Sequence, residues 1–403
     1  MDKNNWHKFP LLFGLYIAQS IPMSFFSTVV PVIMRQEQYS LESIGLIQLV
    51  KLPWILKFLW APIIDNRTKN SRDLRQWIIG SEIFYAIVIF AIGWLDLQAS
   101  FDLIIILMIV AFTASATQDI ATDAFAILIL RKNERSLGNS IQSAGSFVGS
   151  LMGTGVLLIA YYYFGWRVLL WLLAAFVIIA LIPLPFYKRK NPVKKPEAKR
   201  ISPAAVKNFF VQKGMYKRVL LLIFYYSGII GTLAMLKPYM VDLGYTVKEI
   251  GFMSGIFGTA VAASMAMVGG LVQKRIGRRK AMVLFAFINL FSALWFVFIS
   301  LLTPSTAMLY AGIAFLWGGY GLATVVIYTT SMDIVRPGHE GTDFTVQIVL
   351  THLSGLVFAV LSGKIGGMLG YTGLFSVEAG FSLLAILIIF LILHKNQDYA
   401  NIG

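Results

Sequence analysis

Long apolar runs separated by short polar stretches dominate the hydrophobic pattern of this chain. A helix needs about 20 predominantly apolar residues to cross the hydrocarbon core of a bilayer. The alternating pattern of a membrane barrel is absent from the sequence, and lipid does not tolerate an unpaired backbone. The sequence therefore predicts an all-α membrane protein with twelve transmembrane helices, at residues 9–33, 43–64, 77–95, 103–129, 137–161, 166–186, 218–241, 249–271, 281–302, 306–333, 343–366 and 374–393.

Composition supports a membrane protein over a soluble one. Hydrophobic residues make up 58% of the 403 residues and charged residues 13%, whereas a soluble domain carries about 25% charged residues. The chain has no cysteine, so disulfides and thiolate metal ligands are excluded. The first apolar run, residues 11–33, is too long for the core of a cleavable signal peptide, and we interpret it as the first span.

The net charge of +15 is a topology signal because the basic residues gather on one side of the predicted spans. That side holds the N-terminus and the loops 65–76, 130–136, 187–218 and 274–280. The other side holds only Arg35, Arg167 and Lys248. Loops rich in lysine and arginine stay in the cytoplasm, so both termini are expected there. The basic charge is not interpreted as a nucleic-acid site.

An internal repeat divides the chain into two halves. The segment Tyr39-Ser-Leu-Glu-Ser-Ile-Gly45 recurs as Tyr245-Thr-Val-Lys-Glu-Ile-Gly251, each between the first and second span of its half. Parallel repeats of this kind are typical of transporters whose substrate site lies between the halves. We expect a six-helix half at 1–186, a solvated basic linker at 187–217 and a second six-helix half at 218–403.

The fourth predicted span carries two acidic residues inside the membrane. A charge there costs about 2.5–3.5 kcal/mol on insertion scales, so such residues usually face a cavity and have a function. Asp119 and Asp123 are four residues apart and share one face of the helix. Ser115, Gln118 and Thr122 extend this polar stripe.

Lys57 on the second span is predicted to lie at the same depth as the two aspartates. It precedes Asp65 by eight residues, and Asp123 precedes Arg131 by eight, about 12 Å of helix in each case. Two close carboxylates without a cation would force one to hold a proton. A lysine beside them would keep them ionised until protonation released it, as in a proton-coupling switch. The alternative is a static buried ion pair that fixes helix packing.

Other polar positions are weaker candidates. Glu82 and Glu378 lie on the third and twelfth spans, which are expected at the periphery, so a packing role is favoured for them. The positions that we retain as candidates for lining a substrate cavity, beside the polar stripe, are Gln19 on the first span, Tyr328 and Asp333 on the tenth, and His352 on the eleventh.

Signatures of enzymes are missing from the sequence. There is no phosphate-binding Walker loop, no G-x-S-x-G elbow and no H-E-x-x-H metal helix. We therefore expect no enzymatic activity, no cofactor and no metal, with transport driven by a gradient.

One basic loop resembles the signature of the major facilitator superfamily. The segment Gly270-Leu-Val-Gln-Lys-Arg-Ile-Gly-Arg-Arg-Lys280 is similar to G-x-L-A-D-R-x-G-R-R, with Lys274 at the position of the aspartate. The first-half copy keeps the aspartate and loses the glycines. In the superfamily this loop helps to latch the inward face, and the resemblance implies that role for Asp65, Arg67, Arg278 and Arg279. Plain positive-inside charge is the alternative for the two arginines of the second half.

Two first-half motifs narrow the resemblance. Lys57-Phe-Leu-Trp-Ala-Pro-Ile-Ile-Asp65 and the segment Ser115–Ala124 resemble the branch of muropeptide permease AmpG and the acetyl-CoA transporters. The segment Arg336–Gln347 and the opening Ala18-Gln-Ser-Ile-Pro22 are similar to the RhtX/FptX siderophore permeases.

The resemblance implies a monomeric, proton-driven importer in the bacterial inner membrane. The solute that it is expected to import from the periplasm is small, and a siderophore is the favoured substrate. A muropeptide or other metabolite permease of the same fold is the alternative. An exporter, or a membrane scaffold or sensor without transport, also stays open, although a scaffold has no need of intramembrane charge.

Overall fold

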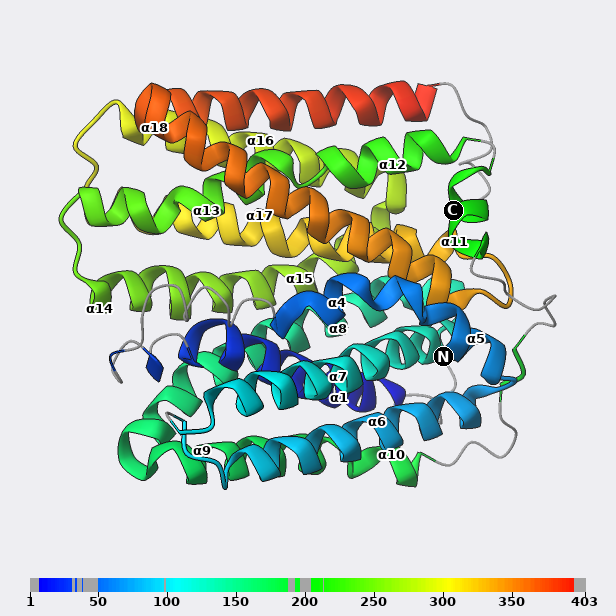
Figure 1. Cartoon of the computed structure of the whole chain (residues 1–403). Coiled ribbons are helices and arrows are strands. Elements are labelled where there is room, and N and C mark those ends of the chain that lie inside the picture. The colour runs from blue at the N-terminus through cyan, green and yellow to red at the C-terminus, as the bar shows by residue number, and fades with distance from the viewer. Residues whose placement is uncertain are drawn as a thin grey trace. The chain divides into compact units, whose positions relative to one another are not determined.

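The computed structural model describes residues 7–30, 33–34, 38, 50–97, 99–187, 193–195, 204–212 and 214–394. Within these ranges the chain forms helices joined by turns, and its only β pairing is an isolated bridge between Asn70 and Lys194. The prediction of an all-α protein is confirmed (Figure 1).

The described helices follow the predicted spans closely. Three short π-helices interrupt or join them. One short 3₁₀ turn lies within span two, and another precedes span five. The bounds are α1 Lys8–Ser24, π-helix η2 Phe25–Val29, α4 Leu52–Leu56, 3₁₀-helix η4 Lys57–Leu59, α5 Ala61–Arg67, α6 Ser71–Ile92, α7 Phe101–Ile129, 3₁₀-helix η5 Lys132–Glu134, α8 Arg135–Leu151, π-helix η6 Met152–Val156, α9 Leu157–Leu181, α10 Pro183–Phe186, α11 Ala204–Phe210, α12 Met215–Phe224, α13 Ser227–Asp242, α14 Val247–Ile250, π-helix η7 Gly251–Phe257, α15 Gly258–Ile276, α16 Arg278–Ser300, α17 Thr306–Asp333 and α18 Glu340–His394.

Eight helices in the described ranges are long and apolar enough to cross a membrane by length and composition. One of them, residues 340–392, contains two predicted spans. The remaining predicted spans, 9–33, 43–64 and 137–161, contain helices that π turns or a 3₁₀ turn divide into shorter pieces. The count covers only the described residues, and the predicted spans 9–33 and 43–64 include residues outside them.

Two glycines turn the chain between adjacent spans. Gly165 within α9 has φ of 72°, and Gly370 within α18 has φ of 67°. This left-handed region is open to glycine without the steric cost that a Cβ brings. Each glycine lies in a predicted turn, between spans five and six and between spans eleven and twelve, and the bend in α18 is visible in Figure 1.

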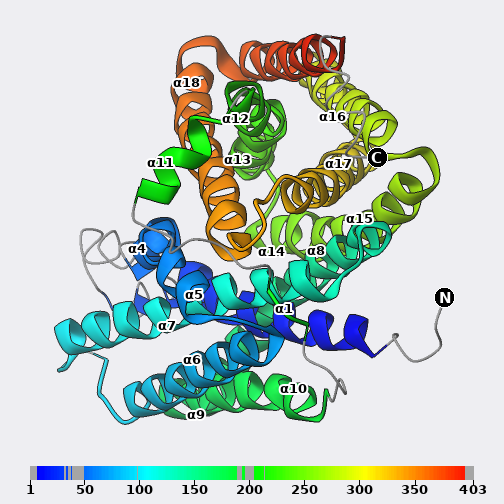
Figure 2. The ribbon, with the colours of Figure 1, turned by 90° about the vertical axis from the view of Figure 1, so that its right-hand side faces the viewer.

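The chain divides into two compact units. Unit 1 comprises residues 1–131, 145–206 and 335–345, and unit 2 comprises residues 132–144, 207–334 and 346–403. In unit 1, α6 packs against α7 and α9; in unit 2, α17 packs against α15 and α16 (Figure 2). Each unit therefore includes a short segment from the other half of the sequence, and the predicted boundaries of the two halves stay predictions.

A row of glycines brings two helices of unit 1 into close contact. Gly145, Gly149 and Gly153 recur every four residues and share one helix face. A Cβ on Gly149 would lie 2.6 Å from the carbonyl oxygen of Ile17, and Gly153 stands equally close to α1 at Ile21. Small residues at this spacing let helix backbones approach in membranes. The contact fixes the position of α1, which contributes two polar side chains to the site below.

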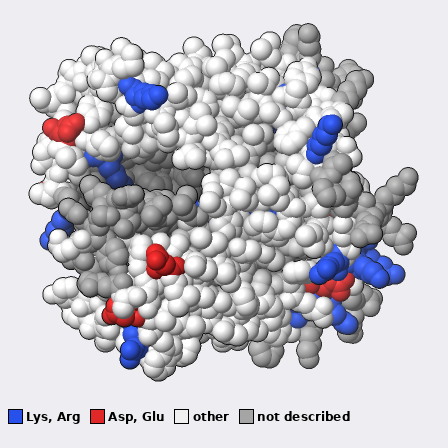
Figure 3. All heavy atoms as spheres, viewed as in Figure 1, with Lys and Arg blue, Asp and Glu red and all other residues white. Residues whose placement is uncertain are grey.

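The surface of the helices suits contact with lipid. Large apolar side chains such as Ile87, Ile106 and Leu391 are 58–70% exposed. Charged side chains lie toward the helix ends on the face shown in Figure 3, and the middle of the helices is almost free of them. An exposed apolar surface of this extent is expected for helices that lie in a membrane.

Candidate functional site

The polar stripe of α7 is buried inside unit 1. Asp119, Asp123 and Ser115 are all at most 5% exposed, and Gln118 and Thr122 are fully buried. Asp119 lies ten residues before the end of α7 at Ile129, a distance of about 15 Å along the helix. Both carboxylates are buried, and Asp119 is the deeper of the two along the helix.

Lys57 forms an ion pair with Asp119. The lysine lies in the 3₁₀ turn η4 between α4 and α5, and its side chain is 1% exposed. Pro62 in the first turn of α5 lacks an N–H and cannot continue an α-helical ladder from α4. The resulting break directs Lys57 inward, where its ammonium also lies 4.7 Å from the centre of the Trp54 ring. A cation over an indole face is stabilised electrostatically.

Helix α1 supplies one hydrogen-bond donor to each aspartate. The amide of Gln19 donates to Asp119, and the hydroxyl of Tyr16 donates to Oδ1 of Asp123 at 2.8 Å. Tyr16 and Gln19 are three residues apart and share a helix face. Asp119 thus has a cation and a neutral donor, whereas the described bond to Asp123 comes from a neutral hydroxyl.

Several polar atoms around the pair keep hydrogen-bonding capacity. Both amide atoms of Gln118, Oγ1 of Thr122 and Oε1 of Gln19 are buried without a hydrogen-bond partner among the described residues. A buried polar group without a partner costs about 1–3 kcal/mol, so each such group in a native protein calls for a bound partner, such as a water, an ion or a ligand. A polar solute with hydroxyl or amide groups would satisfy them.

A second cluster surrounds Asp65 at the end of α5. Its carboxylate accepts hydrogen bonds from the backbone N–H groups of Gly341 and Thr342 at 3.1 and 2.7 Å, and from the Thr342 hydroxyl at 2.6 Å. These residues form the first turn of α18, where the helix dipole attracts an anion. Lys195 completes the cluster with an ion pair of 2.6 Å to Asp65.

A third cluster closes the end of α17 in unit 2. Asp333 is its last residue, and it forms ion pairs with Arg278 and with Arg135, the latter at 3.0 Å. Arg278 also donates to the carbonyl oxygen of Lys132 at 2.8 Å. The structure places Asp333 with Arg278, one of the predicted latch residues. The predicted role of Asp333 in lining a cavity stays a prediction.

The remaining candidates lie on α5, α16, α17 and α18. Arg67 ends α5 and is exposed, and Arg279 is half-buried beside Arg278. Tyr328 is half-buried on α17, and His352 is exposed on α18. Within the described residues, no group of three or more His, Cys, Asp or Glu side chains is placed to hold a metal ion.

Two basic residues show where sequence reasoning was wrong. Lys195 belongs to the linker predicted to be solvated, yet it is 9% exposed because it contacts Asp65. Arg218 was counted as a loop residue, but it lies on α12 and is 1% exposed. Its guanidinium donates to Gln347 Oε1 at 2.9 Å and to Ser331 Oγ at 2.5 Å.

Known proteins match nearly the whole chain. Residues 12–359 match the sequence profile of the Major Facilitator Superfamily. The chain belongs to this superfamily. The anhydromuropeptide permease of Escherichia coli (strain K12) is 25% identical over 403 residues, covering 98% of this chain and 81% of the permease. The protein called AmpG 3 in Rickettsia prowazekii (strain Madrid E) is 25% identical over 415 residues, covering 97% of this chain and 96% of the relative.

Solved structures agree with the fold of a major facilitator. The human organic anion transporter MFSD10 (TETRAN) superimposes with a TM-score of 0.72 at 14% identity, covering 96% of this chain and all of the transporter. A bacterial homologue of the iron transporter ferroportin, in an outward-facing state, gives a TM-score of 0.69 at 14% identity, covering 96% of this chain and 99% of that one. At this identity the likeness concerns the fold alone. The resemblance to the AmpG branch is confirmed, and the resemblance to siderophore permeases is not supported by these relatives.

Proposed function

We propose that this major facilitator imports a small polar solute across the bacterial inner membrane in symport with protons, and that the coupling site is the cluster of Lys57, Asp119, Asp123, Gln19 and Tyr16. The observation that carries the proposal is the buried ion pair between Lys57 and Asp119, far from either end of α7. A purely structural helix contact in lipid is made more cheaply by small apolar residues. Buried charge at this depth is the expected mark of an ion or substrate pathway.

The chemistry of the pair supports coupling. While Asp119 is ionised, Lys57 balances its charge and the two side chains hold η4 against α7. A proton on the carboxylate removes the charge that binds the ammonium, and Lys57 is then free to move toward another acceptor. Asp123, which accepts from the neutral Tyr16 hydroxyl at 2.8 Å, is one turn away and is our candidate for that second acceptor.

The proposed substrate is a sugar-peptide fragment of the cell wall. The relatives named for anhydromuropeptide permeation and AmpG support this choice over a siderophore. The unpartnered amide of Gln118 and hydroxyl of Thr122 fit the hydroxyl and amide groups of such a solute. We propose that they contact it directly, beside the carboxylates.

The clusters at Asp65 and Asp333 are proposed as latches. Each joins the end of one helix to the beginning of another through charged hydrogen bonds, at Thr342 in one case and at Arg135 and Arg278 in the other. Alternating access requires contacts at helix ends that break and form again while the packed bundles move as bodies. Charge-assisted hydrogen bonds have the needed strength without a large apolar contact.

Uptake into reconstituted vesicles tests the function. Radiolabelled anhydromuropeptide should accumulate when a proton gradient is imposed, and a protonophore should abolish accumulation. A ferric siderophore supplied in parallel should not be accumulated. Muropeptide uptake that the protonophore does not reduce would contradict proton symport. Accumulation of the siderophore alone would overturn the proposed substrate.

A further inference from the structure

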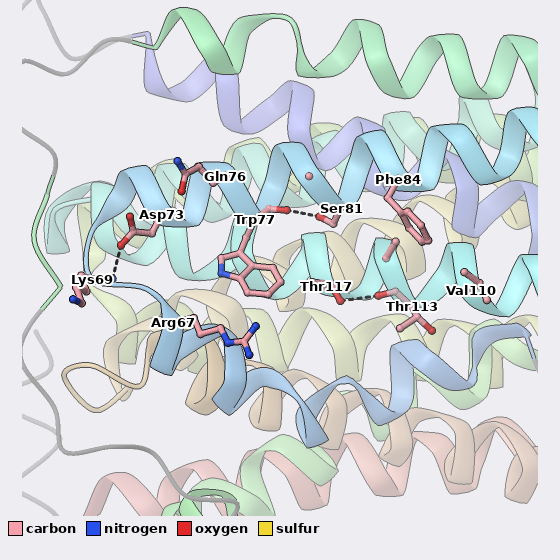
Figure 4. A pocket seen from close by; sticks show the side chains of 12 residues that line it. Arg67, Lys69, Asp73, Gln76, Trp77, Ser81, Phe84, Val110, Thr113 and Thr117 are labelled. Atoms are coloured by element: carbon pink, nitrogen blue, oxygen red, sulfur yellow. Dashed lines mark hydrogen bonds between the residues drawn. The ribbon is translucent and has the colours of Figure 1, made fainter.

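An open groove of about 840 Å³ lies on unit 1, away from the buried aspartates. Helices α6 and α7 form its two walls, and the end of α5 forms its charged end. Arg67, Lys69 and Trp77 line that end, and Gly80, Phe84 and Val110 line the rest (Figure 4). The groove is therefore polar and basic at one end and apolar along its length.

The basic end has two side chains available to a ligand. Arg67 and Lys69 are both exposed, and neither side chain has a hydrogen-bond or ion-pair partner among the described residues. Figure 4 shows Arg67 extending beneath the indole of Trp77. The one acid among the lining residues, Asp73, accepts the backbone N–H of Lys69 through Oδ2 at 2.7 Å, and its single negative charge is outnumbered by the two cations. The lining keeps a net positive charge.

The apolar part of the groove exists because its walls carry small residues. A Cβ on Gly80 would meet no atom within 4 Å, and Ala114 lines the opposite wall on α7. The hydroxyls of Thr113 and Thr117 donate to carbonyl oxygens of their own helix at 2.9 and 2.8 Å. These threonines thus present methyl groups without leaving a donor unsatisfied.

The length of the groove matches one leaflet of a membrane. From Asp73 to Phe84 is eleven residues of α6, about 16 Å at the helical rise. The hydrocarbon core of a bilayer is about 30 Å thick, so half of it is about 15 Å. The apolar end opens on a surface that faces lipid, since Phe84 is 48% exposed and Val110 36%.

We propose that this groove is a binding site for an anionic phospholipid, with the phosphate between Arg67 and Lys69 and one acyl chain along Gly80, Phe84 and Val110. The net positive lining selects an anionic head group over a zwitterionic one. The continuous apolar path selects a lipid over a free phosphate ion. The Trp77 ring lies at the junction, where indole side chains sit at membrane interfaces.

Native mass spectrometry of the purified full chain tests the site. The protein in mild detergent is titrated with phosphatidylglycerol and with phosphatidylcholine of the same acyl chains. Each basic side chain near an anionic surface contributes about fivefold in affinity, so Arg67→Gln with Lys69→Gln should weaken phosphatidylglycerol binding about 25-fold. The matched control, Lys274→Gln with Arg275→Gln, removes two exposed charges from the end of α15 and should leave binding unchanged.

A second variant tests the apolar part and does not depend on the charged end. Gly80→Leu adds a side chain where there is open space, and leucine favours a helix more than glycine does. It should weaken phosphatidylglycerol binding about tenfold, while Gly380→Leu on α18, which also meets open space, should not.

Three results would overturn the proposal. Equal retention of the two lipids by the unchanged protein would mean ordinary lipid contact without selection. Loss of binding in the charge variant but not in Gly80→Leu, with displacement by millimolar inorganic phosphate, would assign the basic end to a free anion. Unchanged binding in both variants, with melting curves that show both are folded, would place the lipid elsewhere.

Discussion

Two carboxylates on long helices of the two units have opposite surroundings. Asp119 lies ten residues inside α7, bound to one lysine and one amide. Asp333 is the last residue of α17 and binds two arginines. Lysine is a mobile point charge, whereas guanidinium holds planar hydrogen-bond geometry and keeps its proton. The comparison teaches that the deep pair suits a proton-dependent change, whereas the terminal cluster suits a contact that forms and breaks without proton transfer.

The largest effect is expected from breaking the deep pair. Lys57→Met leaves Asp119 buried without its cation, and removing one partner of a buried pair costs about 3–5 kcal/mol. Lys57→Met with Asp119→Asn removes both charges and should recover most of that loss. Thermal melting of the three proteins in mild detergent measures the coupling between the sites. A double variant no more stable than Lys57→Met would show that the pair does not govern stability here.

A smaller effect is expected at the end of α17. Asp333→Asn keeps the shape but removes the charge that Arg135 and Arg278 bind, which should cost about 2 kcal/mol, in the range for hydrogen bonds to charged groups. Arg275→Gln, one exposed charge on the neighbouring α15, serves as the control and should change stability by less than about 0.5 kcal/mol. If both variants melt alike, the terminal cluster is an ordinary surface ion pair.

The smallest effect is expected at Asp65, where four donors share one carboxylate. Thr342→Val removes the hydroxyl bond of 2.6 Å and leaves both backbone donors and Lys195, so the cost should be about 1 kcal/mol. Thr345→Val is the matched control on the same helix, because its buried Oγ1 has no hydrogen-bond partner. That control should be neutral or stabilising, and an equal loss in both would contradict the specific role of Thr342.

The fold was predictable because its signals are local. Apolar run length marks the spans, and the turns at Gly165 and Gly370 fall between predicted neighbours. The sequence matched the depth of Lys57 with that of Asp123, and the structure pairs Lys57 with Asp119, one turn earlier on α7. Tyr16 could have been found from its spacing of three residues before Gln19.

Other contacts depend on tertiary structure and leave no local signal. Lys195 looks like any residue of a charged linker, and only its contact with Asp65 distinguishes it. Arg218 lies at the boundary between the predicted linker and the seventh predicted span, and the count of basic residues assigned it to the loop. Its hydrogen-bond partners lie more than one hundred residues away in the sequence, so no local pattern indicates them. The sequence also does not reveal that α8 and α16 bring two arginines to Asp333.

Asp119→Asn in sealed vesicles tests the coupling role of the deep pair most directly. Counterflow of labelled anhydromuropeptide and its accumulation under an imposed potential of 100 mV are measured in the same preparation, normalised to folded protein. One proton moving through 100 mV supplies about 2.3 kcal/mol, enough for roughly 50-fold accumulation of a neutral solute. We predict that Asp119→Asn keeps counterflow but no longer accumulates the solute, while Arg275→Gln, which removes one exposed charge from the end of α15, still accumulates it. Full accumulation by Asp119→Asn would contradict this role and leave the buried pair as a packing contact.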